Sequence, residues 1–546
     1  MSNTRTLKDS AAMRWLALLL VSGLMFSTYW FQDFFSGLKG MMETQMGFTS
    51  EEFGRLIGLT TIANMFGMII VGGIILDKWG VRIAGLAFGG LAVLGGAITA
   101  LASAGYFGEE NQLTYMIIGR ILFGSGLEVV CVVATTTMVK WFKGYELALA
   151  MAINMGFGRL GSAMGIAISP EITGTVSPAV TFAAALLGVT FIMFVIYVFF
   201  DVKLDRQIKS GKTAEENAEK EEDFKFSDLI KLIKNPSFIY IALLCVSFYA
   251  AVFPFIQYAP DLLINKFNFT ATLPEGGFTL NGSTSLGTAV IYVGLFIYAL
   301  LFSIVPSKIE NLSRKFLAMI IIAGSFAFLV YLLRDTFEIW LNNGSKTASL
   351  IPLGTIIFTP IFGNYVDKNG KAASLMILGS LLLIFAHVSL SLFANIYLAY
   401  FGLLSLGIAF SLVPAAMWPS VAKIVPQKRL GTAYSSMFTL QNWGLGLFFW
   451  GIGALLQHVN PQVVQERLTL NETLEAQGLN SGEIAEEINL LKEAGTFPVY
   501  DYTAPILVLV LCGVISIFLA FKLKQADKRQ GYGLELPSSE SAENTA

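Results

Sequence analysis

The chain has 546 residues, of which 55% are hydrophobic and only 14% charged, and its formal net charge is −2. Soluble domains usually contain about 25% charged residues, so this composition cannot cover a water-facing globule of that size. The 44 Phe and three Cys residues exclude a disordered chain and a disulfide-rich scaffold. The balanced charge gives no indication of nucleic-acid binding. We therefore expect an all-α polytopic membrane protein.

Apolar segments of about 20 residues, the length needed to cross the hydrocarbon core of a bilayer, recur along the whole chain. Six of them precede a polar stretch and eight follow it. They lie near 14–38, 52–76, 81–104, 114–139, 145–169, 176–200, 237–263, 286–306, 314–336, 348–366, 372–394, 397–424, 430–456 and 503–523. The sequence thus predicts about fourteen membrane-spanning helices.

Lys and Arg residues gather in alternate connecting segments. Lys140 and Lys143 follow the fourth predicted span, and the polar stretch 202–235 is rich in both residue types. The intervening segments hold few basic residues, Lys39 among them. Because cytoplasmic loops are the ones enriched in Lys and Arg, we expect both termini to be cytoplasmic.

A short motif occurs twice, after the second and after the tenth predicted span. Both copies read G-x-x-x-D-K-x-G and are followed by a basic residue. We expect the first Gly to let two helices approach closely, the Asp to pair with basic groups, and the second Gly to permit a tight turn. The residues are Gly73, Asp77, Lys78, Gly80 and Arg82 in the first copy, and Gly363, Asp367, Lys368, Gly370 and Lys371 in the second.

The doubled motif resembles the cytoplasmic loops that follow helices 2 and 8 of the major facilitator superfamily. The stretches Trp141–Leu147 and Leu430–Tyr434 resemble, more narrowly, its lysosomal dipeptide transporter branch. This resemblance implies two six-helix bundles with a substrate site between them at mid-depth. It also implies passive uniport of small peptides by alternating access.

The resemblance sets the expected domain organisation. The family has twelve spans, so two of the fourteen form an inserted transmembrane hairpin. We expect an N-terminal bundle 14–201, a cytoplasmic linker 202–236, a C-terminal bundle 237–524 with the inserted hairpin 286–336 and the extracytoplasmic loop 457–502, and a cytoplasmic tail 525–546. Within the linker, residues 224–234 predict a short amphipathic helix on the inner membrane surface.

Two residues of opposite charge, Glu128 and Arg159, fall inside neighbouring antiparallel spans. A rise of 1.5 Å per residue from the turn near Gly144 places both about 24 Å deep. A charge at the bilayer centre costs about 2.5–3.5 kcal/mol, so it is usually paired or functional. A zwitterionic peptide needs a carboxylate for its ammonium group and a guanidinium for its carboxylate, and the resemblance assigns these roles to Glu128 and Arg159. The alternative is a salt bridge that locks the two helices.

Three further side chains are candidates for substrate binding. Trp418 lies beside a helix-interrupting Pro and offers an aromatic wall. Gln441 and Asn442 are neutral hydrogen-bonding residues inside the eleventh span of the family pattern. Contacts between helices are the alternative for Gln441 and Asn442, and for Trp418 the alternative is an ordinary kink of the kind common in spans.

Two more charged residues flank these candidates on the outer side. Arg120 resembles an arginine that the family places in gating networks, and a helix-end residue reaching an outside loop is the alternative. Asp33 lies near the end of the first predicted span, so we favour a solvated anchor, and the alternative is a residue that lines the cavity or its outer mouth.

The chain contains no phosphate-binding loop, and His387 and His458 lack metal-ligand spacing. We therefore expect neither enzymatic activity nor a cofactor. The alternatives to peptide uniport are a proton-coupled symporter or antiporter of another small organic ion, because Glu128 could titrate, and a non-transporting membrane receptor or scaffold.

The expected partners are a small-molecule peptide and the lipid bilayer, without nucleic acid. A homodimer or an accessory glycoprotein is implied by the resemblance alone. The compact termini favour a bacterial plasma membrane over a lysosomal membrane.

Overall fold

A computed structural model describes residues 6–211, 231–273, 277–426, 429–479, 483–484, 487–488, 490–491 and 494–537. Across these residues the chain is almost entirely helical, and its only β pairing is two isolated bridges. The expectation of an all-α polytopic membrane protein is confirmed. The amphipathic helix predicted for residues 224–234 lies largely outside the described residues.

The helices before the linker are called here the N-terminal half. They are α1 (Ala11–Asp33), α2 (Phe35–Gln45), α3 (Ser50–Gly58), α4 (Ile62–Met65), α5 (Met68–Ser103), α6 (Gln112–Phe142), α7 (Leu147–Ile168) and α8 (Val176–Gly211). Because α8 continues to Gly211, the first ten residues of the predicted linker are helical.

The helices after the linker are called the C-terminal half. They are α10 (Pro236–Phe267), α11 (Thr284–Lys308), α12 (Leu312–Leu332), α13 (Arg334–Leu341), α14 (Gly344–Asn369), α15 (Ala372–Leu392), α16 (Ile396–Ile424), α17 (Leu430–Val459), α18 (Pro461–Ala476) and α20 (Thr503–Gln530). The bundle boundaries drawn from the sequence stay predictions.

The predicted spans coincide with helices throughout the chain, and 11 helical segments of the described chain are long and apolar enough to cross a membrane. Two spans differ in form from the expectation. The second is broken into α3, α4 and the start of α5, with Gly67 at φ 87° at the last break. The third continues α5 across a kink at Gly80, whose φ of 78° suits a glycine.

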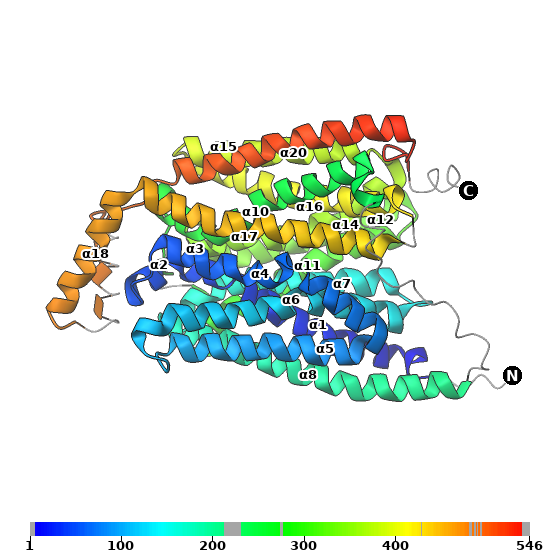
Figure 1. Ribbon diagram of the computed structural model, residues 1–546, viewed down its shortest axis with the longest axis horizontal. Coiled ribbons are helices and arrows are strands. Elements are labelled where there is room, and N and C mark those ends of the chain that lie inside the picture. Colours follow the sequence, from blue (N-terminus) through cyan, green and yellow to red (C-terminus); the bar gives the residue numbers. More distant parts are fainter. Residues whose placement is uncertain are drawn as a thin grey trace.

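The long helices run side by side, with the N-terminal half below the C-terminal half (Figure 1). The described segments near both termini lie at the same end of the molecule, and α18 crosses the opposite end (Figure 1). We call these the inner and the outer end, following the orientation that the basic residues predict. The halves meet where α3 packs against α17, α2 against α10, and α7 against α14.

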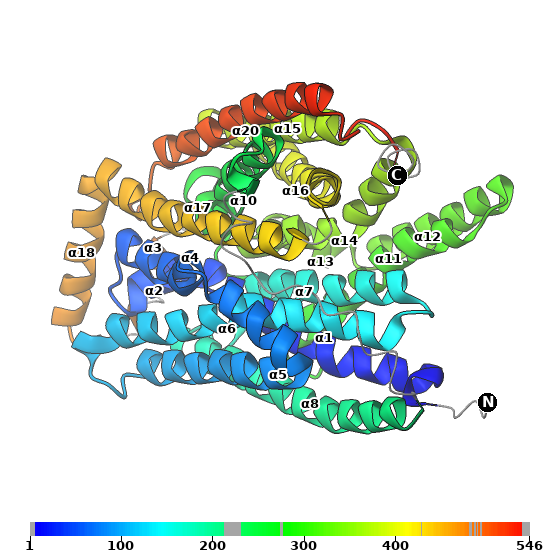
Figure 2. The same cartoon turned by 45° about the vertical axis from the view of Figure 1, so that its right-hand side comes forward.

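The predicted hairpin consists of α11 and α12, and its two helices differ in their packing. Helix α11 packs against α7 and α14 and so contacts both halves. Helix α12 projects away from the bundle (Figure 2), and Ile322 is its only buried residue. Its exposed apolar surface is what a lipid-facing helix requires.

The glycines of the doubled motif do not act as expected. A Cβ atom on Gly73 or Gly363 would meet nothing within 4 Å, so the predicted close helix approach is wrong at both positions. The approach occurs at Gly72, where a Cβ atom would lie 2.2 Å from a methyl carbon of Val129 on α6. The second glycines have positive φ values, 78° at Gly80, which lies at the kink within α5, and 67° at Gly370, which follows the end of α14.

The other motif residues lie at the inner end. Asp77, Lys78, Asp367, Lys368 and Lys371 are exposed. Arg82 lies 2.9 Å from a carboxylate oxygen of Asp205 on α8. Asp367 interacts electrostatically with Lys423 on α16.

The segment after α20 folds back onto the second motif copy. The amide groups of Lys371 and Ala372 donate to the carbonyl groups of Glu535 and Leu534, both at 3.1 Å. The Glu535 carboxylate accepts hydrogen bonds from the amide and hydroxyl groups of Ser374, at 2.9 Å and 2.6 Å. The described part of the predicted tail therefore caps the first turn of α15.

We expect Gly161→Ala to destabilise the protein, because the new Cβ atom would lie 2.0 Å from the carbonyl oxygen of Phe26 on α1. Such overpacking typically costs about 1–3 kcal/mol. The control is Gly188→Ala, where a Cβ atom would meet nothing within 4 Å. Thermal unfolding in detergent should show a lowered midpoint for Gly161→Ala alone, and equal midpoints would contradict the packing described here.

Candidate functional site

Glu128 lies on α6, is half-buried, and faces the C-terminal half. Its carboxylate interacts with the side chain of Asn442 on α17. Asn442 also donates to the carbonyl oxygen of Phe438, one turn earlier in its own helix, at 2.9 Å. Two candidates from different halves, 314 positions apart in the sequence, are therefore brought into contact.

Arg159 lies on α7 and also reaches across to the C-terminal half. The central carbon of its guanidinium lies 4.5 Å from the centre of the Phe410 ring on α16, a cation–π contact. Arg159 is half-buried, whereas Phe410 is buried. The guanidinium is thus held against an aromatic face of the opposite half.

Glu128 and Arg159 are neighbours that do not pair with each other. Within the described chain, the ion pairs closer than 4.0 Å do not include one between these two residues. Tyr29, Cys131 and Tyr249 each interact electrostatically with both charges. The two charges therefore border the same region between the halves, and the helix-locking salt bridge is absent from this conformation.

Trp418 belongs to an aromatic cluster beside these charges. Its indole Nε1 donates to the hydroxyl group of Tyr249 at 3.1 Å, and its ring stacks on Phe438 with centroids 4.9 Å apart. Phe253, also on α10, stacks on Tyr249 and meets Phe410 edge to face. The cluster connects Trp418 to the ring that Arg159 covers.

Gln441 lies apart from the charged pair. It is buried, and its side-chain oxygen accepts a weak hydrogen bond from the Cys245 thiol on α10 at 3.5 Å. This contact joins two helices of the same half, as the packing alternative expects. Of the two adjacent amides, only Asn442 contacts a predicted charge.

Asp33 is more deeply buried than the sequence analysis expected. It is 3% exposed, so its interpretation as a solvated anchor is wrong. Its carboxylate accepts a hydrogen bond from Ser162 on α7 and another from Gln257 on α10, the latter at 2.7 Å. The misjudgement arose because the apolar run Phe34–Phe35 continues the helix into α2, which places Asp33 well inside the protein.

Arg120 is fully buried, which excludes the alternative of a helix-end residue reaching an outside loop. Its guanidinium donates to the carbonyl oxygen of Phe31 at 2.6 Å and to the hydroxyl group of Thr60 at 3.0 Å. Asp33 interacts electrostatically with both Arg120 and Arg159. The buried acid thus serves as a counter-charge for the buried Arg120 and the half-buried Arg159.

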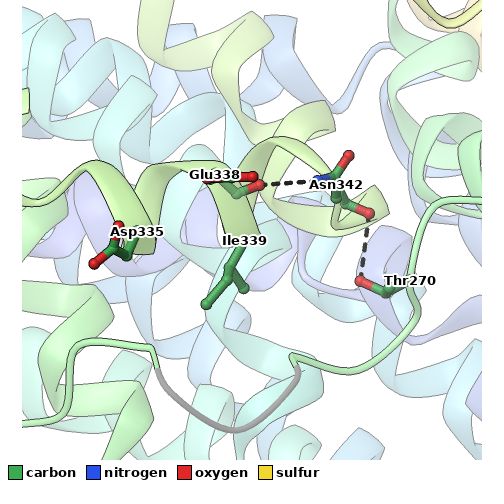
Figure 3. A pocket seen from close by; sticks show the side chains of 5 residues that line it. All are labelled: Thr270, Asp335, Glu338, Ile339 and Asn342. Atoms are coloured by element: carbon green, nitrogen blue, oxygen red, sulfur yellow. Dashed lines mark hydrogen bonds between the residues drawn. The ribbon is translucent and has the colours of Figure 1, made fainter.

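A separate pocket of about 400 Å³ opens beside α13 and is lined by Thr270, Asp335, Glu338, Ile339 and Asn342 (Figure 3). It lies at the outer end, where the side chain of Asn342 donates to the carbonyl oxygen of Glu338 at 3.1 Å. None of the residues predicted for substrate binding lines this pocket. It is therefore distinct from the charged region between the halves.

We expect Asp33→Ala to destabilise the fold, because it removes two hydrogen bonds and the counter-charge of Arg120 and Arg159. Removing one partner of a buried ion pair typically costs about 3–5 kcal/mol. The control is Asp33→Asn, which keeps one oxygen acceptor for Gln257 and loses the charge and the acceptor of the Ser162 hydroxyl group. Unfolding midpoints should fall in the order wild type, Asn, Ala; a midpoint for Ala at the wild-type value would disprove the counter-charge role.

Comparison with known proteins identifies the family to which the chain belongs. The model of the Major Facilitator Superfamily matches residues 18–343. The chain is 26% identical over 450 residues to the lysosomal dipeptide transporter MFSD1 of Danio rerio, covering 81% of this chain and 80% of the relative. It is 25% identical over 451 residues to the same transporter of Homo sapiens, covering 80% and 78%.

Solved structures resemble the fold. One is a bacterial homolog of the human lysosomal transporter Spinster in an inward-facing, unoccupied conformation, with a TM-score of 0.57, 12% identity, and 95% and 99% of the two chains covered. Another is the nucleoside transporter NupG, with a TM-score of 0.53, 12% identity, and 94% and 99% covered. At such identities the likeness concerns the fold alone. Together with the family match, it shows that this chain is an integral multi-pass membrane transporter belonging to the major facilitator superfamily.

Proposed function

We propose that the protein moves small peptides across the membrane by alternating access, as a uniporter. Glu128 holds the ammonium group of the peptide and Arg159 holds its carboxylate. The observation that carries this proposal is the arrangement of the two charges, which border one region and each contact the opposite half. The names of the curated relatives as dipeptide transporters support the same substrate class.

The contacts across the two halves explain how binding and movement are linked. Asn442 and Phe410 belong to the C-terminal half, whereas the charges they contact belong to the N-terminal half. A peptide bound between Glu128 and Arg159 competes with these contacts for the same charged groups. Its binding therefore changes the free energy that holds the halves together in this conformation.

Trp418 and Asn442 complete the proposed site. Asn442 orients the Glu128 carboxylate, and the aromatic cluster around Trp418 forms one wall beside Arg159. A substrate-binding role for Gln441 has less support, because its side chain contacts Cys245 within the C-terminal half.

The membrane that houses the protein stays a prediction. The relatives named above are vertebrate lysosomal proteins, which does not favour the bacterial plasma membrane expected from the sequence. The cytoplasmic placement of both termini rests on the basic loops, and an accessory glycoprotein or a homodimer rests on resemblance alone.

We expect Glu128→Gln and Arg159→Ala each to weaken peptide binding roughly tenfold to 100-fold, because each removes a charge-assisted hydrogen bond worth about 1.5–3 kcal/mol. The measurement is dipeptide counterflow in proteoliposomes, with and without an uncoupler. The control is Glu109→Gln, an exposed acid at the outer end. Unchanged counterflow in both site variants would refute the site, and net dipeptide uptake that collapses with the uncoupler would replace uniport by proton coupling.

Modified peptides test which charge binds which end. An N-acetylated dipeptide lacks the ammonium group, so its weaker binding should not weaken further in Glu128→Gln. A C-amidated dipeptide should behave in the same way toward Arg159→Ala. The assignment is wrong if the two losses add in full, or if acetylation is non-additive with Arg159→Ala instead.

A further inference from the structure

The segment between α17 and α20 carries a structural feature that peptide binding does not explain. Helix α18 crosses the outer end of the bundle (Figure 1), and residues 494–502 return along it toward α20. Leu474, Ile484, Ile488 and Phe497 form a small hydrophobic core of this segment. We call α18 and residues 494–502 together the outer strap.

Arg467 of α18 connects the strap to both halves. Its Nη1 donates to the carboxylate of Glu43 on α2 at 2.7 Å, and its Nη2 donates to the side-chain oxygen of Asn265 on α10 at 2.9 Å. It also donates twice to the carbonyl oxygen of Pro498 in the strap's return segment, at 2.9 Å and 2.7 Å. One guanidinium thus joins the N-terminal half, the C-terminal half and both parts of the strap.

Beneath Arg467 lies an ion pair that links the halves directly. Lys39 on α2 is fully buried and lies 2.7 Å from Glu43 and 2.8 Å from Asp261 on α10. The Glu43 carboxylate is therefore shared by Lys39 and Arg467. Two cations and two carboxylates balance in this buried cluster, and removing Arg467 leaves an excess negative charge.

The return segment of the strap covers the same cluster from the other side. The Tyr500 ring lies 3.9 Å from the guanidinium carbon of Arg467 and 4.9 Å from the Lys39 nitrogen. The Tyr500 amide donates to Asn265 at 3.0 Å, and the Tyr502 hydroxyl group donates to Asp261. The strap thus shields the Lys39–Asp261 pair from water, which strengthens the attraction between its charges.

At the inner end, the ion pairs named here between described residues each lie within one half. Lys140–Asp201 joins two helices of the N-terminal half, and Lys524–Glu535 joins two segments of the C-terminal half. At the outer end, Lys346 on α14 also pairs with Glu171 across the halves, but without the strap. The strap therefore acts on an end where ion pairs hold the halves together.

We propose that the outer strap is a lock that holds the outer end closed, and that Arg467 must release Glu43 and Asn265 before this end opens. The strap is continuous with α17 and α20 of the C-terminal half, so its contact with Glu43 on α2 is one that opening must break. Its release removes the cover of the Lys39–Asp261 pair, which then becomes hydrated and weaker. The proposal concerns the conformational equilibrium of the empty transporter and does not rest on the identity of the cargo.

Cysteine labelling from each side of the membrane tests the lock. In a background with Cys131, Cys245 and Cys512 replaced by Ala, Ser36→Cys reports opening of the outer end, because Ser36 is buried against α10 one turn below Lys39. Met155→Cys reports the inner side. It is exposed and lies one turn from Arg159 on the same face of α7.

We expect Arg467→Ala to raise the labelling rate of Ser36→Cys by an outside maleimide at least about fivefold, equivalent to about 1 kcal/mol. The rate at Met155→Cys from inside should fall, because one end closes as the other opens. Unfolding instead raises both rates. The matched control is Glu466→Ala, the adjacent exposed acid of the strap, which should change neither rate.

Tyr502→Phe is a milder second variant. It keeps the buried ring and loses only the hydrogen bond to Asp261. We expect the labelling rate to rise at Ser36→Cys and to fall at Met155→Cys, both by less than in Arg467→Ala. The lock is overturned if two results coincide. The first is that folded Tyr502→Phe labels at the wild-type rates. The second is that Arg467→Ala, folded or unfolded, does not show a faster rate at Ser36→Cys with a slower rate at Met155→Cys. All measurements are made without peptide, so a failure of the peptide proposal leaves them interpretable.

Discussion

The structure depends on one constraint, which is that charges enclosed in a membrane-embedded protein need partners there. A buried ion without a partner costs several kcal/mol, so the position of each partner determines which helices stay together. Here the partners often come from the opposite half. Lys39 finds Asp261 across the interface, and Asp33 finds Gln257. The charges therefore hold together two halves that a transporter must also be able to separate.

These cross-half contacts follow one another along α1 and α2, from the middle of the protein to its outer end. Asp33 lies nearest to Arg159, Ser36 donates to the carbonyl oxygen of Ile256 one turn farther out, and Lys39 follows after another turn. Glu43 ends the series under the strap. Ser36 and Lys39 lie about one turn apart on α2, so a rotation of α2 away from α10 breaks both of their contacts with α10 together. Such cooperative breakage suits a change between two discrete conformations.

The sequence predicted the helices well and individual contacts less well. Long apolar runs identify spans because a membrane sets a minimum length, and opposite charges inside spans are too costly to be accidental. The closely approaching glycine was misassigned by one position, Gly73 for Gly72. One position corresponds to a rotation of about 100° around the helix, and only the packing of α5 against Val129 fixes that rotation.

The burial of some charged residues could not be predicted, because their partners are revealed only by the folded structure. Lys39 reads as a loop residue because a Lys and a Glu lower the local hydropathy, yet they neutralise each other four residues apart inside α2. The burial of Asp33 depends on Ser162 and Gln257, which are distant in the chain. Glu128 and Arg159 could be placed near one another by counting residues, but their partners Asn442 and Phe410 could not.

The capping of α15 by Glu535 has a consequence for biosynthesis. The amide of Ser374 receives its carboxylate partner from a residue 161 positions later. At about 5–20 residues per second, a ribosome needs roughly 8–32 s to supply that residue. During this interval the first turn of α15 lacks its cap, so the inner end of the second half reaches its final form only after Glu535 has been synthesised.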